Sequence, residues 1–205
     1  MTTQQSQQML KPRSSILFGF IVLCILFRLV PYVMYQLGVS IASYPMNFSP
    51  MLPLCLFGAA YMQERKWSYA VPLIAWGIGD LAIGLLMWNW KSAFYPAQPV
   101  VYLAYVGVIS LGFLLRRKRS VSMLAGTAFL SAFLFYLLSN FGVWALGGAY
   151  AHTWAGLQKC YVMALPYFRN SLLSMAVFCP VLFSRYALTA VNPQQDDARL
   201  AASIS

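Results

Sequence analysis

Three ionisable side chains lie inside long apolar stretches of this sequence: Arg28, Asp80 and Arg169. A charge at the centre of a bilayer costs at least about 2.5–3.5 kcal/mol, so such residues usually face a partner group or a wet cavity. If the three share one cavity, the residual charge is about +1, which a carboxylate or phosphate held by an arginine fork would neutralise. The pattern therefore predicts a pocket for a small anionic or zwitterionic molecule.

The composition places these residues in an integral membrane protein. The chain is 60% hydrophobic and only 9% charged, which leaves too little polar surface for a soluble globule. Apolar stretches of roughly 20 residues recur along almost its whole length, and each is long enough to cross a hydrocarbon core of about 30 Å. We therefore expect one all-α transmembrane domain over residues 15–188. A disordered polar N-terminus (1–14) should precede it, and a flexible cytoplasmic tail (189–205) should follow it.

Hydropathy predicts six transmembrane helices in this domain, so that both chain ends lie on one side of the membrane. Their expected ranges are 15–37, 47–63, 68–88, 98–115, 120–146 and 157–187. Ten basic residues flank the side of the chain ends, against two, Lys91 and Lys159, on the other. The ten are Lys11, Arg13, Arg65, Lys66, Arg116, Arg117, Lys118, Arg119, Arg185 and Arg199. This asymmetry predicts cytoplasmic termini in a bacterial inner membrane, and the basic run 116–119 favours anionic lipid headgroups over nucleic acid as its contact.

Five more residues join the three charged ones as candidate ligand contacts. With a rise of about 1.5 Å per residue, the helices bring all of them into the outer half of the membrane. They are Asn47, Asn140, Trp144, Tyr161 and Asn170. Pro166 removes a backbone hydrogen bond near Arg169 and predicts a kink there. Amides and an indole N–H beside aromatic rings are typical of a wall that holds a flat organic ligand.

Enzymatic motifs are missing from the sequence. It contains no GxxxxGK[ST], HExxH, GxSxG or GxGxxG pattern. The four cysteines stand singly in apolar runs, and His152 is the only histidine, in a connecting segment. We therefore expect no catalytic residues, no metal site and no cofactor, and any energy source for transport would lie in a partner.

Several short segments resemble a family of uncharacterised six-helix bacterial inner-membrane proteins. They include RLVP (28–31), NFSPM (47–51), GD (79–80), SNFGVW (139–144) and ALPYFRN (164–170). That family is similar in size and helix number to the substrate-binding S components of energy-coupling-factor (ECF) transporters. The resemblance implies an outward-facing pocket for a vitamin or other small metabolite, and partners that comprise a transmembrane scaffold and ATPase subunits. It also implies that the eight candidate residues contact the substrate.

Two other functions remain open at this stage. Small residues such as Gly58, Gly77 and Gly126 permit close helix approach, so the chain could be a structural or assembly subunit of a larger membrane complex. A lipid-modifying membrane enzyme would have to rely on Asp80 and His152, with Tyr161 and Arg169, because the sequence has no paired acids in its spans. Stable co-purification with another membrane protein, unaffected by loss of Arg28 or Arg169, would favour the structural subunit. Turnover of a substrate by the purified protein, lost in Asp80→Asn, would favour the enzyme.

Overall fold

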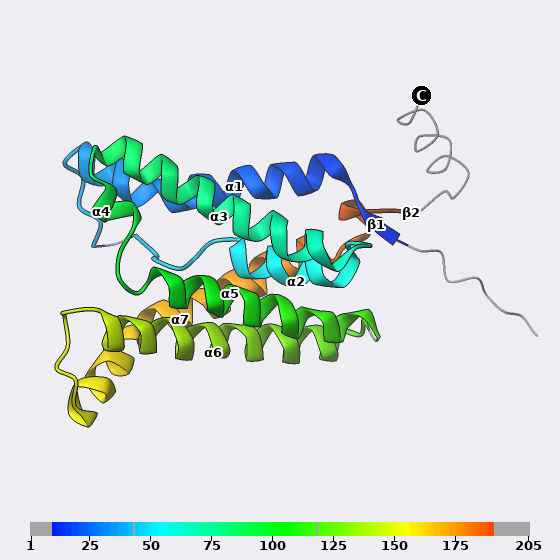
Figure 1. Ribbon diagram of the computed structural model, residues 1–205. Coiled ribbons are helices and arrows are strands. Elements are labelled where there is room, and N and C mark those ends of the chain that lie inside the picture. The colour runs from blue at the N-terminus through cyan, green and yellow to red at the C-terminus, as the bar shows by residue number, and fades with distance from the viewer. Residues whose placement is uncertain (1–9, 43, 118, 191–205) are drawn as a thin grey trace, which may run out of the picture.

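The protein is a bundle of helices that lie side by side along one axis, as Figure 1 shows for a computed structural model. The structure describes residues 10–190 except 43 and 118. The long helices are α1 (Ser14–Gln36), α3 (Arg65–Met87), α5 (Gln98–Gly112), α6 (Val121–Leu146) and α7 (Trp154–Leu182). The short ones are α2 (Met51–Tyr61), α4 (Trp90–Ala93), η1 (Phe113–Arg116) and η2 (Arg185–Ala187). The expected helical architecture is thus confirmed.

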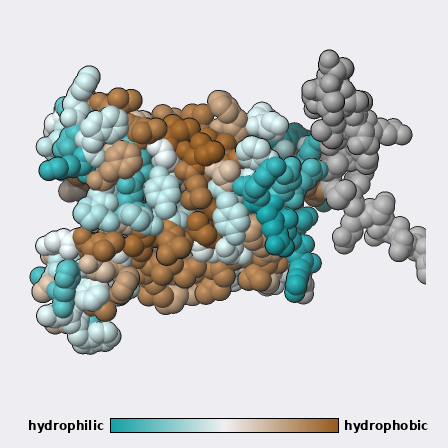
Figure 2. Space-filling view, in the orientation of Figure 1, coloured by the Kyte–Doolittle hydropathy of each residue, from teal (hydrophilic) through white to brown (hydrophobic). Residues whose placement is uncertain are grey.

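Within the described residues, five helical stretches are long and apolar enough to cross a membrane. They are Ser14–Gln36, Arg65–Met87, Trp90–Arg116, Val121–Leu146 and Trp154–Leu182. Figure 2 shows an apolar band across the middle of the bundle and hydrophilic residues at the end where the described chain begins and ends. These are the properties of a multi-pass membrane protein.

The second expected span differs from its prediction. A helix over 47–63 was expected to cross the bilayer, but α2 has only 11 residues, or about 16 Å of helix against a hydrocarbon core of about 30 Å. Asn47 adopts a left-handed conformation (φ 66°), and Pro50 stands as the N-cap, so the helix begins only after both. Residues 38–42 and 44–50 therefore run irregularly from the far end of α1 into the middle of the bundle, and α2 continues from there (Figure 1).

Helix α2 forms the centre of the core. All 11 of its residues are buried, and it packs against α3, α5 and α7. A helix that is apolar on every side, as this one is, belongs in the interior of a bundle. Because α2 directly follows the irregular segment, its packing against α3, α5 and α7 fixes the end of that segment inside the bundle.

Arginines from the α5–α6 connection bind the C-terminal end of α2. Arg116 donates from Nε to the Ala59 carbonyl at 2.7 Å and from an Nη to the Met62 carbonyl at 2.7 Å. Arg119 donates to the Ala60 carbonyl at 3.2 Å. Cations stabilise the carbonyl end of a helix through its dipole and its unpaired acceptors. Two of the basic residues counted as a topology signal thus also have a structural role.

A small β ladder joins the two ends of the described chain. Strand β1 (Leu10–Pro12) pairs antiparallel with β2 (Leu188–Ala190), and Arg13 Nε donates to the Leu188 carbonyl at 3.0 Å. The expected disordered N-terminus (1–14) and flexible tail (189–205) therefore both include ordered residues, because the bundle brings the two ends together. The rest of those two segments, 1–9 and 191–205, lies outside the described residues.

Candidate functional site

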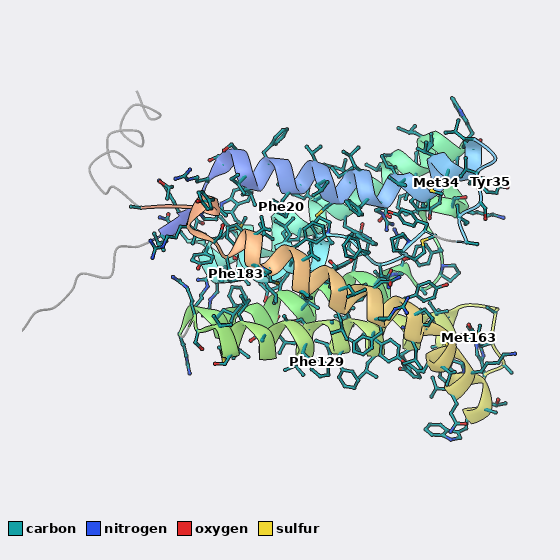
Figure 3. All side chains as sticks on the ribbon, turned by 180° about the vertical axis from the view of Figure 1, so that it is seen from behind. Phe20, Met34, Tyr35, Phe129, Met163 and Phe183 are labelled. Atoms are coloured by element: carbon teal, nitrogen blue, oxygen red, sulfur yellow. The ribbon has the colours of Figure 1, made fainter. Side chains whose placement is uncertain are left out.

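A cavity of about 150 Å³ lies among the helices. Helix α1 and the irregular segment 44–49 supply most of its wall, and α2, α3, α5, α6 and α7 supply one residue each. Its polar wall residues include Arg28, Asn47 and Ser49. Seven aromatic side chains also line it: Phe27, Tyr32, Tyr44, Phe48, Trp76, Tyr105 and Phe135. Figure 3 labels two residues of α1: Phe20 towards the chain ends, and Met34 near the opposite end of the helix. The four α1 residues that line the cavity lie between Phe20 and Met34 in the sequence.

Arg28 on one wall of the cavity forms an ion pair with Asp80. The Asp80 side chain is only 1% exposed. Its other oxygen accepts hydrogen bonds from Gln98 Nε2 at 2.6 Å and from the Tyr102 hydroxyl at 2.8 Å. A buried carboxylate is tolerated when its acceptor sites are filled in this way. Asp80 thus neutralises the arginine from behind the cavity wall, since it does not itself line the cavity.

Helix α3 provides the surface on which Arg28 rests. Trp76, Gly79 and Asp80 are spaced so that they share one face of the helix. The Arg28 guanidinium carbon lies 3.5 Å from the centre of the Trp76 ring, and a Cβ at position 79 would lie 2.6 Å from Arg28 Cδ. The missing side chain of Gly79 therefore lets the arginine lie close against α3.

Two N–H donors of this wall are unsatisfied. Arg28 Nε and Trp76 Nε1 are buried and have no hydrogen-bond partner among the described residues. Each buried donor left without an acceptor costs about 1–3 kcal/mol, and such groups in a folded protein call for a specific explanation. An acceptor-bearing molecule would supply one once the two side chains turn these covered N–H groups towards the cavity that they line. Ser131 Oγ on α6 is unpartnered in the same sense, but Ser131 is not part of the cavity wall.

The irregular segment that closes the cavity is tied to α7 and α1. Asn170 Nδ2 donates to the Met46 carbonyl at 2.9 Å, the Ser174 hydroxyl donates to the Ser49 carbonyl, and the Tyr44 hydroxyl donates to the Phe27 carbonyl at 2.7 Å. Non-helical backbone at membrane depth occurs only where protein buries it or where it lines a cavity. This segment meets the second condition, since five of its residues line the cavity.

The eight residues predicted from the sequence occupy different parts of the bundle. Arg28 and Asn47 line the cavity, Asp80 holds Arg28, and Asn170 holds the irregular segment. Arg169 is exposed and is not among the wall residues. The structure therefore does not bring Arg169 together with Arg28 and Asp80.

The remaining three candidates lie where α6 contacts α7, towards the end of the bundle opposite the chain ends. Asn140 donates to the Tyr136 carbonyl of its own helix at 2.7 Å, and the Tyr161 hydroxyl donates to the Leu137 carbonyl at 2.9 Å. Trp144 Nε1 donates to the Ala151 carbonyl at 2.9 Å. The Tyr161 bond joins α7 to α6, and the Trp144 bond joins α6 to the connection between them. None of the three residues lines the cavity.

Among the residues that sequence reasoning missed are Trp76, which lines the cavity, and Gln98 and Tyr102, which bond to Asp80. Trp76 stands four residues before Asp80, and Gln98 stands four residues before Tyr102. Residues four apart share a helix face, so Trp76 could have been found as a neighbour of Asp80. The contact of Gln98 and Tyr102 with Asp80 depends on how α5 packs against α3, which the spacing does not give. Within the described residues, no three His, Cys, Asp or Glu side chains are placed to hold a metal ion.

Comparison with known proteins gives one relationship. The chain matches a family of unknown function (DUF6580) over residues 8–196. No curated protein and no solved structure matches it. The match spans all the helices of the structure. The family has no known function, so the chemistry has to be argued from the site itself.

Proposed function

We propose that this chain, which belongs to the DUF6580 family, is a membrane-embedded receptor for a small polar organic molecule. The observation that carries the proposal is the pair of unpartnered buried donors, Arg28 Nε and Trp76 Nε1, on side chains that line one cavity. The aromatic wall provides apolar contact, and the two N–H groups provide orientation. Mostly apolar pockets with a few placed polar groups are typical of small-molecule sites.

We further propose that the receptor serves uptake across a bacterial inner membrane, in the manner of an ECF S component. The described ends of the chain lie together at one end of the bundle (Figure 1), and the excess of basic residues on that side favours a cytoplasmic location for it. The cavity then lies towards the outer side. The sequence carries no nucleotide-binding loop, so a scaffold and ATPase subunits are the partners that this function requires.

The test is mass spectrometry of small molecules that co-purify with the full chain in mild detergent. Wild type should carry a metabolite that is lost in Arg28→Ala and reduced in Trp76→Phe, which removes the indole N–H while it keeps an aromatic ring. Arg169→Ala is the matched control, since it also removes an arginine from an apolar stretch but alters a side chain outside the cavity wall.

Two results would contradict the receptor. One is the absence of any molecule that depends on Arg28 while both arginine variants remain folded. The other is equal loss in Arg28→Ala and Arg169→Ala, which would indicate a general effect of removing a positive charge. Either result would favour the structural-subunit alternative.

A further inference from the structure

The ion pair and the shape of the cavity bear on the class of ligand. We propose that the ligand has no net charge, a flat body about as large as a single six-membered ring, and at least one hydrogen-bond acceptor. This inference rests on the proposed function, because it concerns the same cavity. It narrows the anionic or zwitterionic class that the sequence predicted to molecules without net charge.

Charge balance excludes a simple anion as the preferred ligand. Arg28 already has its counter-charge in Asp80, and Gln98 and Tyr102 keep that carboxylate hydrogen-bonded. Arg169, which would have supplied a second positive charge, is not part of the wall. An anion would therefore leave the buried site with an excess negative charge, and desolvation of an uncompensated charge is expensive.

A cation is excluded by the same pair. An aromatic wall by itself would suit a cationic ligand. Here, however, the guanidinium of Arg28 already lies against the face of Trp76, 3.5 Å from the ring centre. A second cation would meet a like charge at the face best suited to hold it. The donors that remain, two N–H groups, need an acceptor.

The volume of the cavity fits a small ligand. Its volume is about 150 Å³, and a buried apolar cavity of about 150 Å³ in another protein is filled by one benzene. Three of the rings around it contact one another: Trp76 and Tyr105 lie 4.7 Å apart between ring centres, and Tyr105 and Phe135 lie 4.9 Å apart. Rings in such contact favour a flat guest, because planar groups stack against them.

Three probes with one ring and nearly equal size separate the possibilities. Benzamide is neutral and carries a carbonyl acceptor, benzoate is anionic, and benzamidine is cationic at neutral pH. We would measure the binding of each to the full chain in lipid nanodiscs by equilibrium dialysis. Benzamide should bind at least about tenfold more tightly than either charged probe, because a buried uncompensated charge carries a large penalty.

The preference should reverse when the counter-charge is removed. In Asp80→Asn the amide keeps an oxygen for Gln98 or Tyr102, but the site becomes positive, so benzoate should bind more tightly than benzamide. Trp76→Phe should weaken benzamide binding without changing the order of the probes, since it removes a donor and no charge. The wild-type order stands as a test on its own if Asp80→Asn does not fold.

The outcomes distinguish this inference from the proposed function. Tighter binding of benzoate or benzamidine to wild type would overturn the neutral ligand and leave the receptor intact. Equal binding of all three probes would also overturn it. Binding of no probe, together with no Arg28-dependent metabolite, would overturn the receptor itself.

Discussion

Arg28 is a charged residue in the membrane that the protein accommodates by several contacts at once. Asp80 pairs with it, Trp76 offers its ring face, and Gly79 leaves space for its side chain. Each contact comes from one face of α3, so the position of the arginine is set by a single helix. The donor of Arg28 that remains unpartnered, Nε, is thereby held in a defined place against Gly79.

Gly79→Ala tests this arrangement at the residue scale. A Cβ there would lie 2.6 Å from Arg28 Cδ and 3.1 Å from Nε, so the arginine must move away from α3 and strain its pair with Asp80. We expect the free energy of unfolding to fall by about 1–3 kcal/mol, the usual cost of an overpacked core. Thermal or denaturant unfolding in detergent would measure it, and Arg28-dependent ligand binding should weaken in parallel.

Gly126→Ala is the control for that variant. Gly126 is also within a helix, but a Cβ at this position meets nothing within 4 Å. Its replacement should leave stability unchanged or raise it by about 0.5–1 kcal/mol, the ordinary difference between Gly and Ala in a helix. Equal destabilisation by both alanines would refute the special role of Gly79.

At the scale of elements, the irregular segment before α2 distinguishes this bundle from a set of simple spans. It interrupts what would otherwise be a second membrane-crossing helix, and it places Asn47, Phe48 and Ser49 on the cavity wall. Its carbonyl groups cannot bond within a helix, so α7 supplies donors for two of them. The cavity therefore requires both the interruption and the donors on α7.

Asn170→Ala should loosen this segment. The Met46 carbonyl would lose the amide that donates to it at 2.9 Å, and an unpaired carbonyl costs about 1–2 kcal/mol. We expect lower stability and weaker ligand binding, measured by unfolding and by dialysis. In Asn140→Ala, the comparison variant, the lost bond goes to Tyr136 of the same helix, so neither property should change as much. A larger effect from Asn140→Ala would contradict the anchoring role of Asn170.

Arg116→Ala should destabilise the carbonyl end of α2. The arginine bonds two carbonyls there, Ala59 and Met62, and hydrogen bonds from charged donors contribute about 1.5–3 kcal/mol. Because Arg116 is itself partly exposed, we expect a loss of about 1–2 kcal/mol. Arg117→Ala removes the same charge from an exposed neighbour and should have little effect. Equal losses from the two would mean that charge, and not these bonds, matters.

At the scale of the whole molecule, the bundle has two chemically different ends. One end holds the β ladder and the basic residues that bind α2, while the cavity lies towards the other (Figure 3). All four cysteines are buried, so cysteines introduced at the surface can be labelled with little reaction of the native ones. This polarity underlies the proposed orientation.

Cysteine labelling checks that orientation. Lys66 lies in the first turn of α3, at the end of the bundle that holds the described chain ends, and Lys91 lies in α4 at the opposite end (Figure 1). Both residues are exposed. In a variant without the native cysteines, a membrane-impermeant maleimide added to intact cells should label Lys91→Cys but leave Lys66→Cys unreacted until the membrane is opened. The reverse pattern would turn the cavity towards the cytoplasm and exclude uptake from the outer side.

The sequence by itself determined the class of this protein and most of its helices. Long apolar runs have to be helical in lipid because their backbone groups have no water to bond, so 120–146 could be placed almost residue for residue as Val121–Leu146. Arg28 and Asp80 could be singled out because charge in such runs is costly. Hydropathy along the chain indicates how deep each residue lies in the membrane, and it does so for each helix without reference to its neighbours.

Only the tertiary structure decided which residues at the same depth face one another. Arg169 and Arg28 were expected at similar depth, yet one is exposed and the other lines the cavity, because the rotation of each helix is set by packing against its neighbours. The break before α2 and the pairing of residues 10–12 with 188–190 likewise depend on contacts between segments far apart in the chain. Those contacts are what form the cavity, so the site is a property of the folded bundle.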